Sequence, residues 1–215
     1  MLLEHGDRIV FAGDSVTDMG SFSPVGEGNG LGNGYVHLVD SFLGAFYPEL
    51  HIRVTNSGMD GHNSRMLLER FDRDVTELNP DWVSICIGIN DVWRQFDSLA
   101  FHEAHTPLET YEQNLEAMVA KIKGKVKGII MMTPYYIEDN EKDAMRARMD
   151  EYGAVMKKVA EKHGAIFVDL QKVFADFCKV RHSTNIAWDR VHPNQRGAML
   201  IAKAFLKAIG FDFSK

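Results

Sequence analysis

Five short apolar runs alternate along this chain with longer stretches that carry apolar residues at helical spacing. The runs are mostly continuous, which is typical of strands buried on both faces of a sheet. They lie at residues 8–12, 51–55, 82–87, 127–132 and 165–169. Strands separated by helices connect through right-handed crossovers, which produce a parallel sheet with helices on both sides. We therefore predict an α/β fold, a three-layer αβα sandwich around a flavodoxin-like five-stranded parallel sheet of order 2-1-3-4-5.

The helical stretches complete this pattern. One carries Tyr35, Val39 and Phe42 on one face and is stopped by Pro48, and the last opens at Pro193. Three more are expected at 64–78, 110–123 and 144–163. The sequence contains no internal repeat, no low-complexity linker and no break in composition. Residues 1–215 are therefore expected to form a single domain, a size that suits one substantial core.

Charge and hydropathy exclude several classes of protein. The formal net charge is −6 and the lysines and arginines form no cluster, which argues against nucleic acid or an anionic membrane surface as a partner. No apolar run approaches the roughly 20 residues that span a bilayer, and the first residues lack the features of a signal peptide. Cys86 lies in an apolar run and Cys178 in an amphipathic stretch, so we expect two buried free thiols. These features predict a cytoplasmic protein.

Two short motifs near opposite ends of the chain supply the parts of a serine hydrolase. Gly-Asp-Ser at 13–15 follows directly on the first apolar run, which places Ser15 where a strand ends and a turn begins. Asp189 and His192 lie three residues apart, and Pro193 favours a helix start directly after the histidine. A hydroxyl nucleophile, an imidazole base and a carboxylate that orients the base form a Ser-His-Asp triad. Each motif alone is common.

The predicted strand order brings further residues to the same place. In such a sheet the loops after the first three strands meet where the strand order reverses, and Ser15, Gly58 and Asn90 follow those strands. We expect the Ser15 and Gly58 backbone N–H groups and the Asn90 amide to form an oxyanion hole, because acyl transfer requires donors directed at the developing charge. Glycine allows close approach of the backbone, and the asparagine amide donates without carrying charge. Taken singly, Gly58 and Asn90 are also ordinary turn residues.

The remaining motifs indicate no cofactor and no metal. The glycines between Pro24 and Gly34 do not match a phosphate-binding pattern, so we expect a mobile loop that flanks the site. The stretch 135–143 is polar and acidic and is expected to cover the edge of the sheet. His102 and His105 have no third ligand near them in sequence, and we predict loop histidines rather than a metal site.

These segments resemble the four sequence blocks of the SGNH (GDSL) hydrolase family: Gly-Asp-Ser at 13–15, Asn-x-Gly at 56–58, Gly-x-Asn-Asp at 88–91 and Asp-x-x-His at 189–192. The resemblance spans nearly the whole chain, and the combination is highly specific. It implies an SGNH hydrolase fold with Ser15 as nucleophile, His192 as general base and Asp189 as its orienting partner. It also implies that Ser15, Gly58 and Asn90 form the oxyanion hole. The chain has no Gly-x-Ser-x-Gly motif, which excludes the α/β-hydrolases as close relatives.

A narrower resemblance, to the intracellular acetylxylan esterases of this family, rests on further stretches. They include Tyr-Pro-Glu-Leu at 47–50, Gly-Ile-Asn-Asp-Val-Trp-Arg-Gln at 88–95 and Ala-Trp-Asp-Arg-Val-His-Pro at 187–193. The resemblance implies removal of acetyl groups from sugar hydroxyls and assembly as a homo-oligomer. This chain carries His62 where such relatives usually have asparagine, a departure that bears on the substrate.

We therefore predict a serine esterase that removes short acyl groups, acetyl in particular, from sugar hydroxyls. A lysophospholipase or acyl-thioesterase of the same fold would use the same chemistry with another pocket. A carbohydrate-binding relative without catalysis is a further alternative. Trp93 and Trp188 lie near Asn90 and Asp189 in sequence. Either both are core residues, or one stacks on a sugar ring while the other packs against a neighbouring subunit.

Overall fold

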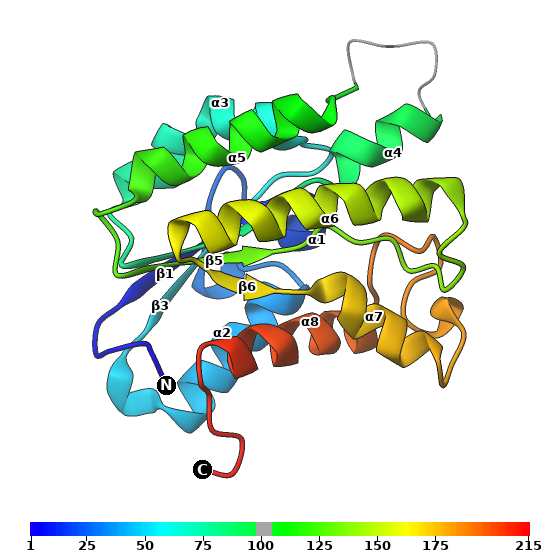
Figure 1. The fold of residues 1–215 in the computed structure, drawn as a ribbon. Helices are drawn as coiled ribbons and strands as arrows, with labels where there is room; N and C mark the ends of the chain where they lie inside the picture. Colours follow the sequence, from blue (N-terminus) through cyan, green and yellow to red (C-terminus); the bar gives the residue numbers. More distant parts are fainter. Residues whose placement is uncertain (98–104) are drawn as a thin grey trace.

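The computed structural model of the protein describes residues 1–97 and 105–215 (Figure 1). At its centre is a six-stranded sheet of order β2-β3-β1-β4-β5-β6. The parallel strands are β1 (Arg8–Gly13), β3 (Arg53–Gly58), β4 (Trp82–Cys86), β5 (Gly128–Met132) and β6 (Ile166–Val168). Their order is the predicted 2-1-3-4-5. The sequence prediction lacks β2 (Gly26–Glu27), which pairs antiparallel with β3 at one edge, because two residues are too few to show a periodic pattern.

Helices cover both faces of the sheet (Figure 1). One layer contains α3 (Ser64–Asp74), α5 (Leu108–Ile122) and α6 (Ala144–His163), with α4 (Ile89–Asp97) beside them. The other layer contains α2 (Tyr35–Phe46), α7 (Leu170–Cys178) and α8 (Gln195–Ala208). Turns of 3-10 helix lie at Gly28–Gly30, Pro48–Leu50, Thr76–Leu78 and Ser183–Asn185. The prediction of an α/β fold with a helix-flanked sheet is confirmed.

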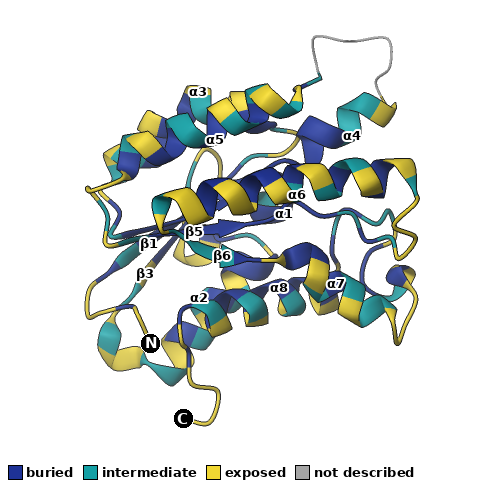
Figure 2. Cartoon of the chain, viewed as in Figure 1, coloured by how far each residue is buried: buried dark blue, intermediate teal, exposed yellow. Residues whose placement is uncertain are grey.

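Each face of the sheet packs on its own hydrophobic core. Along β1, Ile9 and Phe11 join the core under α2 and α8, whereas Val10 and Ala12 join the core under α3, α5 and α6. The alternation follows from the period of two in a strand. Because both faces are covered, all four side chains are buried and the strand is continuously apolar in sequence. Figure 2 shows the central strands as mainly buried and the outer helix faces as exposed.

Several boundaries differ from the sequence prediction. The helix expected over 64–78 ends at Asp74, and a 3-10 turn continues it to Leu78. The last helix begins at Gln195 and not at Pro193, because the Asn194 side chain caps it. The short helices α1 (Ser15–Asp18) and α4 are absent from the prediction, since they have too few turns to show a clear periodicity. The amphipathic stretch expected around Cys178 corresponds to α7.

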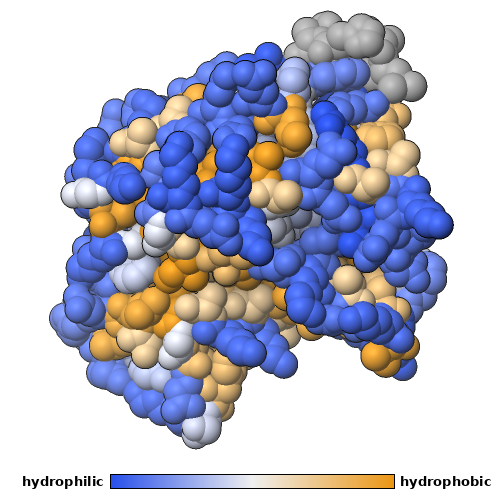
Figure 3. Space-filling view, viewed as in Figure 1, coloured by the Kyte–Doolittle hydropathy of each residue, from blue (hydrophilic) through white to orange (hydrophobic). Residues whose placement is uncertain are grey.

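The surface in the view of Figure 3 is largely hydrophilic, with apolar side chains in separate patches. Within the described part of the chain, no helix has both the length and the apolar character needed to cross a membrane.

The carboxyl ends of β1, β3 and β4 lie level at one edge of the sheet. Gly13 pairs in register with Gly58 on one side and with Cys86 on the other. The loops that follow these strands therefore start side by side, as the predicted strand order requires.

A fourth segment, residues 187–193, is held by the stretch that follows β5. The Tyr135 hydroxyl donates to the Val191 carbonyl at 3.1 Å, and the Ile137 N–H donates to the Arg190 carbonyl at 2.9 Å. These bonds hold the histidine-bearing segment. The stretch 135–143 thus fixes the position of the segment that carries His192.

Candidate active site

Ser15 is placed by a sharp transition from strand to helix. It is the first residue of α1, and the Asp14 carboxylate caps this helix by accepting the Val16 N–H at 3.0 Å. The serine is 8% exposed, so only a small part of it reaches the surface. The Ser15 Oγ lies 2.8 Å from His192 Nε2, which is the distance of a direct hydrogen bond.

The His192 ring is oriented by Asp189. Its Nδ1 lies 2.6 Å from Asp189 Oδ2, and the other carboxylate oxygen accepts the N–H groups of Val191 and His192. A carboxylate only accepts, so Nδ1 carries the proton and Nε2 is free to accept from the serine hydroxyl. Burial alone would raise the pKa of Asp189. The hydrogen bonds from His192 and from the two backbone N–H groups outweigh burial, so its pKa lies below the ordinary value.

The Asn90 amide lies at the start of α4, beside the loop that follows β3. Its Nδ2 donates to the His62 carbonyl at 2.9 Å, and its Oδ1 accepts from Arg94 Nη2 at 3.1 Å. An amide nitrogen has two protons, so one remains for a ligand. The Ser15 N–H, at the first position of α1, makes no hydrogen bond within the described residues.

Gly58 requires a correction. Its N–H is not free for an oxyanion, because it donates to the Asn56 side chain at 2.8 Å. The glycine is instead required for packing, since a Cβ at this position would lie 2.2 Å from the Asp18 backbone nitrogen. The absence of a side chain lets β3 lie directly against α1, which keeps the helix that begins at Ser15 in place.

Arg70 is a central residue of the site that the sequence prediction lacks. It is 6% exposed, and its guanidinium donates to the carbonyls of Gly13 and Ser57, both at 2.9 Å. It also pairs with Asp74 and donates through Nε to His62 Nδ1 at 3.3 Å. The side chain therefore ties the ends of β1 and β3 to the loop that contacts Asn90. An arginine and an aspartate four residues apart, among apolar residues at helical spacing, are the sequence signal for this pair.

Two buried carboxylates lie next to the predicted site residues in sequence. Asp14 precedes Ser15, and its burial raises its pKa to about 7. Asp91 follows Asn90, and its burial raises its pKa to about 6, although it accepts two hydrogen bonds from Ser64. In the described residues the Asp14 carboxylate accepts from Val16 and the Asp91 carboxylate from Ser64, and neither accepts from Ser15 or His192.

The two tryptophans lie in different environments. Trp93 is half-buried, and its ring centroid lies 5.9 Å from that of His192. Trp188 is 83% exposed directly before Asp189, which rules out a core position for it. One large aromatic ring therefore packs beside the histidine, and another is free to contact a ligand or a partner.

The other sequence expectations give a mixed result. Both cysteines are free thiols, as expected. Cys86 is buried, whereas Cys178 is half-buried, so the expectation of a buried thiol is confirmed only for Cys86. His105 lies in a loop as predicted, whereas His102 lies outside the described residues. In residues 1–97 and 105–215 no group of three or more metal-ligating side chains is placed to hold an ion. The glycine-rich stretch 24–34 flanks α8, since Gln195 donates to the Asn33 carbonyl at 2.6 Å.

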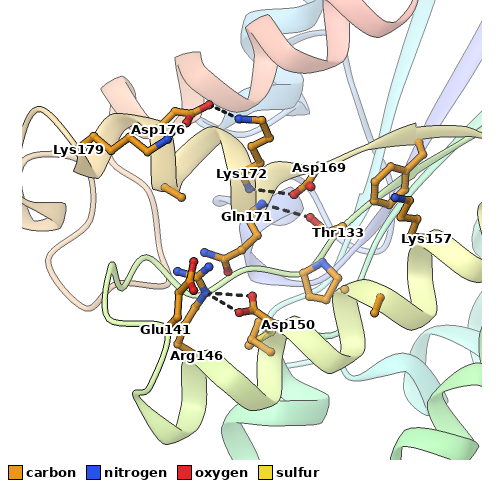
Figure 4. Close-up of a pocket in the computed structure, with 16 residues that line it drawn as sticks. Thr133, Glu141, Arg146, Asp150, Lys157, Asp169, Gln171, Lys172, Asp176 and Lys179 are labelled. Carbon is orange, nitrogen blue, oxygen red and sulfur yellow. Dashed lines mark hydrogen bonds and ion pairs between the residues drawn. The ribbon is translucent and has the colours of Figure 1, made fainter.

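A separate cavity of about 370 Å³ lies between α6 and α7 (Figure 4). Several of its charged side chains are paired with each other, as in Arg146 with Asp150 and Lys172 with Asp176. None of the triad residues lines it. The cavity therefore lies apart from the candidate active site.

The fold and the site together define a serine hydrolase built on an open parallel sheet. Residues 11–200 match the model of the GDSL-like lipase/acylhydrolase family, and the chain belongs to this family. The predictions of an SGNH hydrolase and of a carboxylic ester hydrolase are confirmed.

Known relatives show which members of the family this chain is similar to. The chain is 49% identical over 215 residues to an acetylxylan esterase of Geobacillus stearothermophilus, and the match covers 99% of this chain and 98% of that protein. A crystal structure of Axe2, an acetylxylan esterase from the same organism, superposes with a TM-score of 0.97 at 50% identity, covering 99% of this chain and 98% of that one. A human isoamyl acetate-hydrolyzing esterase 1 homolog is 27% identical over 187 residues, covering 79% of this chain and 68% of its own length. The predicted similarity to acetylxylan esterases is confirmed.

Proposed function

We propose that the protein is a serine esterase that removes acetyl groups from the hydroxyls of acetylated xylooligosaccharides. The observation that carries this proposal is the unbroken chain of hydrogen bonds from Ser15 through His192 to Asp189. In this hydrogen-bonded triad Ser15 is the nucleophile and His192 is the general base. Asp189 orients the histidine ring and stabilises its cation.

The reaction follows from these roles. Ser15 Oγ bonds to the acetyl carbon while its proton passes to His192 Nε2, and the carbonyl oxygen becomes an oxyanion. When the intermediate collapses, the bond to the sugar oxygen breaks and His192 returns the proton to that oxygen. Water then attacks the acetyl-serine, with His192 taking and returning a proton in the same way. The products are the free sugar hydroxyl and acetate.

The oxyanion requires hydrogen-bond donors, and the bond from the Gly58 N–H to Asn56 favours another glycine of this region as the donor. We propose the Ser15 N–H, the second proton of Asn90 Nδ2 and the Gly61 N–H. At the end of β3 and in the loop after it, the N–H groups of Gly58, Met59 and His62 all donate within the protein. The Gly61 N–H makes no hydrogen bond in the described part of the chain. Gly61 directly precedes His62, whose carbonyl contacts Asn90, and its positive φ of 73° suits glycine.

The solved relatives support the assignment of the triad. Structures of catalytic mutants of Axe2 have a serine at position 15, an aspartate or a histidine replaced by alanine. The aspartate and the histidine of that protein are three residues apart, the spacing of Asp189 and His192 here. The similar spacing and the 49% identity favour the same roles.

We also propose that residues 1–215 act as one domain, that the protein is cytoplasmic and that it assembles as a homo-oligomer. Its net charge of −6 supports a protein that binds neither nucleic acid nor a membrane. Trp188 is exposed directly before Asp189. Its exposure supports contact with a sugar ring or with a neighbouring subunit, because Trp is favoured at both kinds of surface.

The test is acetate release from acetylated xylooligosaccharides, measured beside aryl esters of increasing acyl length. We expect activity on the acetylated sugars and a steep fall from acetyl to butyryl and octanoyl esters. A preference for octanoyl esters would favour the lysophospholipase or thioesterase alternative. Sugar binding without acetate release, and without labelling by a fluorophosphonate, would favour a non-catalytic carbohydrate-binding protein.

A further inference from the structure

The Asn90 side chain is held at both ends by partners whose chemistry fixes its orientation. Arg94 Nη2 donates to Oδ1 at 3.1 Å, and Nδ2 donates to the His62 carbonyl at 2.9 Å. A guanidinium can only donate and a carbonyl can only accept, so the flipped amide would lose both bonds. The remaining Nδ2 proton therefore has one fixed direction.

Arg94 is in turn held by neighbours on α4. It lies four residues after Asn90, so the two side chains share one face of the helix. Its guanidinium lies 5.0 Å from the centroid of the Trp93 ring and forms an ion pair with Asp97. The Trp93 ring is also the one that packs beside His192. One cation is thus in contact with the proposed oxyanion donor and with the aromatic ring beside the proposed base.

We propose that Arg94 is a positioning residue for ester hydrolysis. It fixes the Asn90 amide and draws electron density from Oδ1, so that the free Nδ2 proton becomes a stronger donor to the oxyanion. Hydrogen bonds to a charged group are stronger than neutral ones, and bonds in series polarise one another. The inference rests on the proposed function, in which Asn90 stabilises the oxyanion.

The role predicts a particular kinetic signature. Arg94 acts on a donor that matters in the transition state, so its loss lowers kcat and leaves KM nearly unchanged. We expect Arg94→Ala to lower kcat about tenfold to a hundredfold, less than the roughly 10²–10³ that follows removal of a whole oxyanion donor. Arg94→Lys recovers part of the loss, because an ammonium also donates to Oδ1 but without the planar geometry of a guanidinium.

Arg148 on α6 offers a matched control. It lies 5.1 Å from the centroid of the Tyr152 ring and pairs with Glu151 three residues later, as Arg94 pairs with Asp97. Both arginine side chains are 31% exposed. Arg148→Ala therefore removes the same kinds of contact, and also the bond from Arg148 Nε to Gln95 of α4 at 3.2 Å, without touching Asn90. It should leave kcat unchanged.

Asn90→Ala, alone and combined with Arg94→Ala, completes the experiment. With no amide left to position, Arg94→Ala should cost nothing further in the Asn90→Ala background. An equal cost in both backgrounds, an effect confined to KM, or an equal loss in Arg148→Ala overturns the proposal.

The outcomes also separate this inference from the proposed function. Full activity in Asn90→Ala removes the oxyanion role itself, whereas loss in Asn90→Ala with full activity in Arg94→Ala removes only the role of Arg94. Thermal unfolding establishes that each variant folds. Arg94→Met, which retains packing on Trp93, replaces the alanine variant if that variant does not fold.

Discussion

Replacing Asp14 by asparagine should stabilise the protein at alkaline pH, and the gain should shrink as the pH falls. Asp14 is 1% exposed, and burial raises its pKa from 3.8 to about 7, with a further contribution from the charge of Asp91. An asparagine oxygen can still accept the Val16 N–H, so the cap of α1 is retained while the buried charge is removed.

The sign and the size follow from proton linkage. In the folded protein Asp14 takes up its proton near pH 7, whereas in the unfolded chain it does so near 3.8. Between these values the folded state binds more protons, so the wild type loses stability as the pH rises and the penalty is complete above about pH 7. A shift of about three pKa units corresponds to about 4 kcal/mol in the free energy of unfolding.

The assay is urea denaturation of the wild type and of Asp14→Asn at several pH values. The difference in the free energy of unfolding should grow by about 3 kcal/mol between about pH 5 and pH 8, with the variant the more stable. Asp169→Asn is the matched control, because Asp169 also caps a helix after a strand but is exposed. A pH-independent difference between wild type and Asp14→Asn, or the same trend in the control, would refute the reasoning.

Three further predictions concern stability, backbone and assembly. Arg70→Met should lower the free energy of unfolding by about 3 kcal/mol, because the carbonyls of Gly13 and Ser57 lose a buried donor, while Asp74 keeps its pair with Arg73. Urea denaturation measures this change, and a value near zero would contradict the role of Arg70 in tying β1 to β3. Gly58→Ala should lower the unfolding midpoint more than Gly61→Ala, because only the Cβ at position 58 meets backbone. Alanine at 61 keeps the N–H but disfavours the positive φ that directs it, so Gly61→Ala should chiefly lower kcat; the reverse pattern would restore Gly58 as donor. Trp188→Ala should give a smaller species in light scattering, and an unchanged mass would exclude Trp188 from the subunit interface.

The order of the sheet follows from the sequence because buried parallel strands leave continuous apolar runs. All five runs correspond to parallel strands, and they come in the predicted order. The strand β2 and the short helices α1 and α4 leave no such signal, because their lengths of two, four and nine residues show too little periodicity. Strand order alone sufficed to place Ser15 and Asn90 at one edge.

The site is only partly predictable for a different reason. The triad could be predicted because the side-chain types of Ser15, Asp189 and His192 indicate a serine hydrolase. Hydrogen bonds join these side chains in the structure. A backbone N–H has no such signature, so the choice between Gly58 and Gly61 depends on which group is already bonded. The roles of Arg70 and Arg94 depend equally on contacts. In sequence they are a charge on an apolar helix face and an ordinary surface arginine.

The central claim, that Ser15 is the nucleophile, has a direct measurement. Purified wild type and Ser15→Ala are compared for acetate release from acetylated xylooligosaccharides and, by peptide mass spectrometry, for the site of fluorophosphonate attachment. We predict one adduct, on Ser15 of the wild type, and a folded Ser15→Ala protein that takes up no label and loses several orders of magnitude in kcat. Near-normal turnover by the folded variant, or an adduct on another residue of the wild type, would contradict the account.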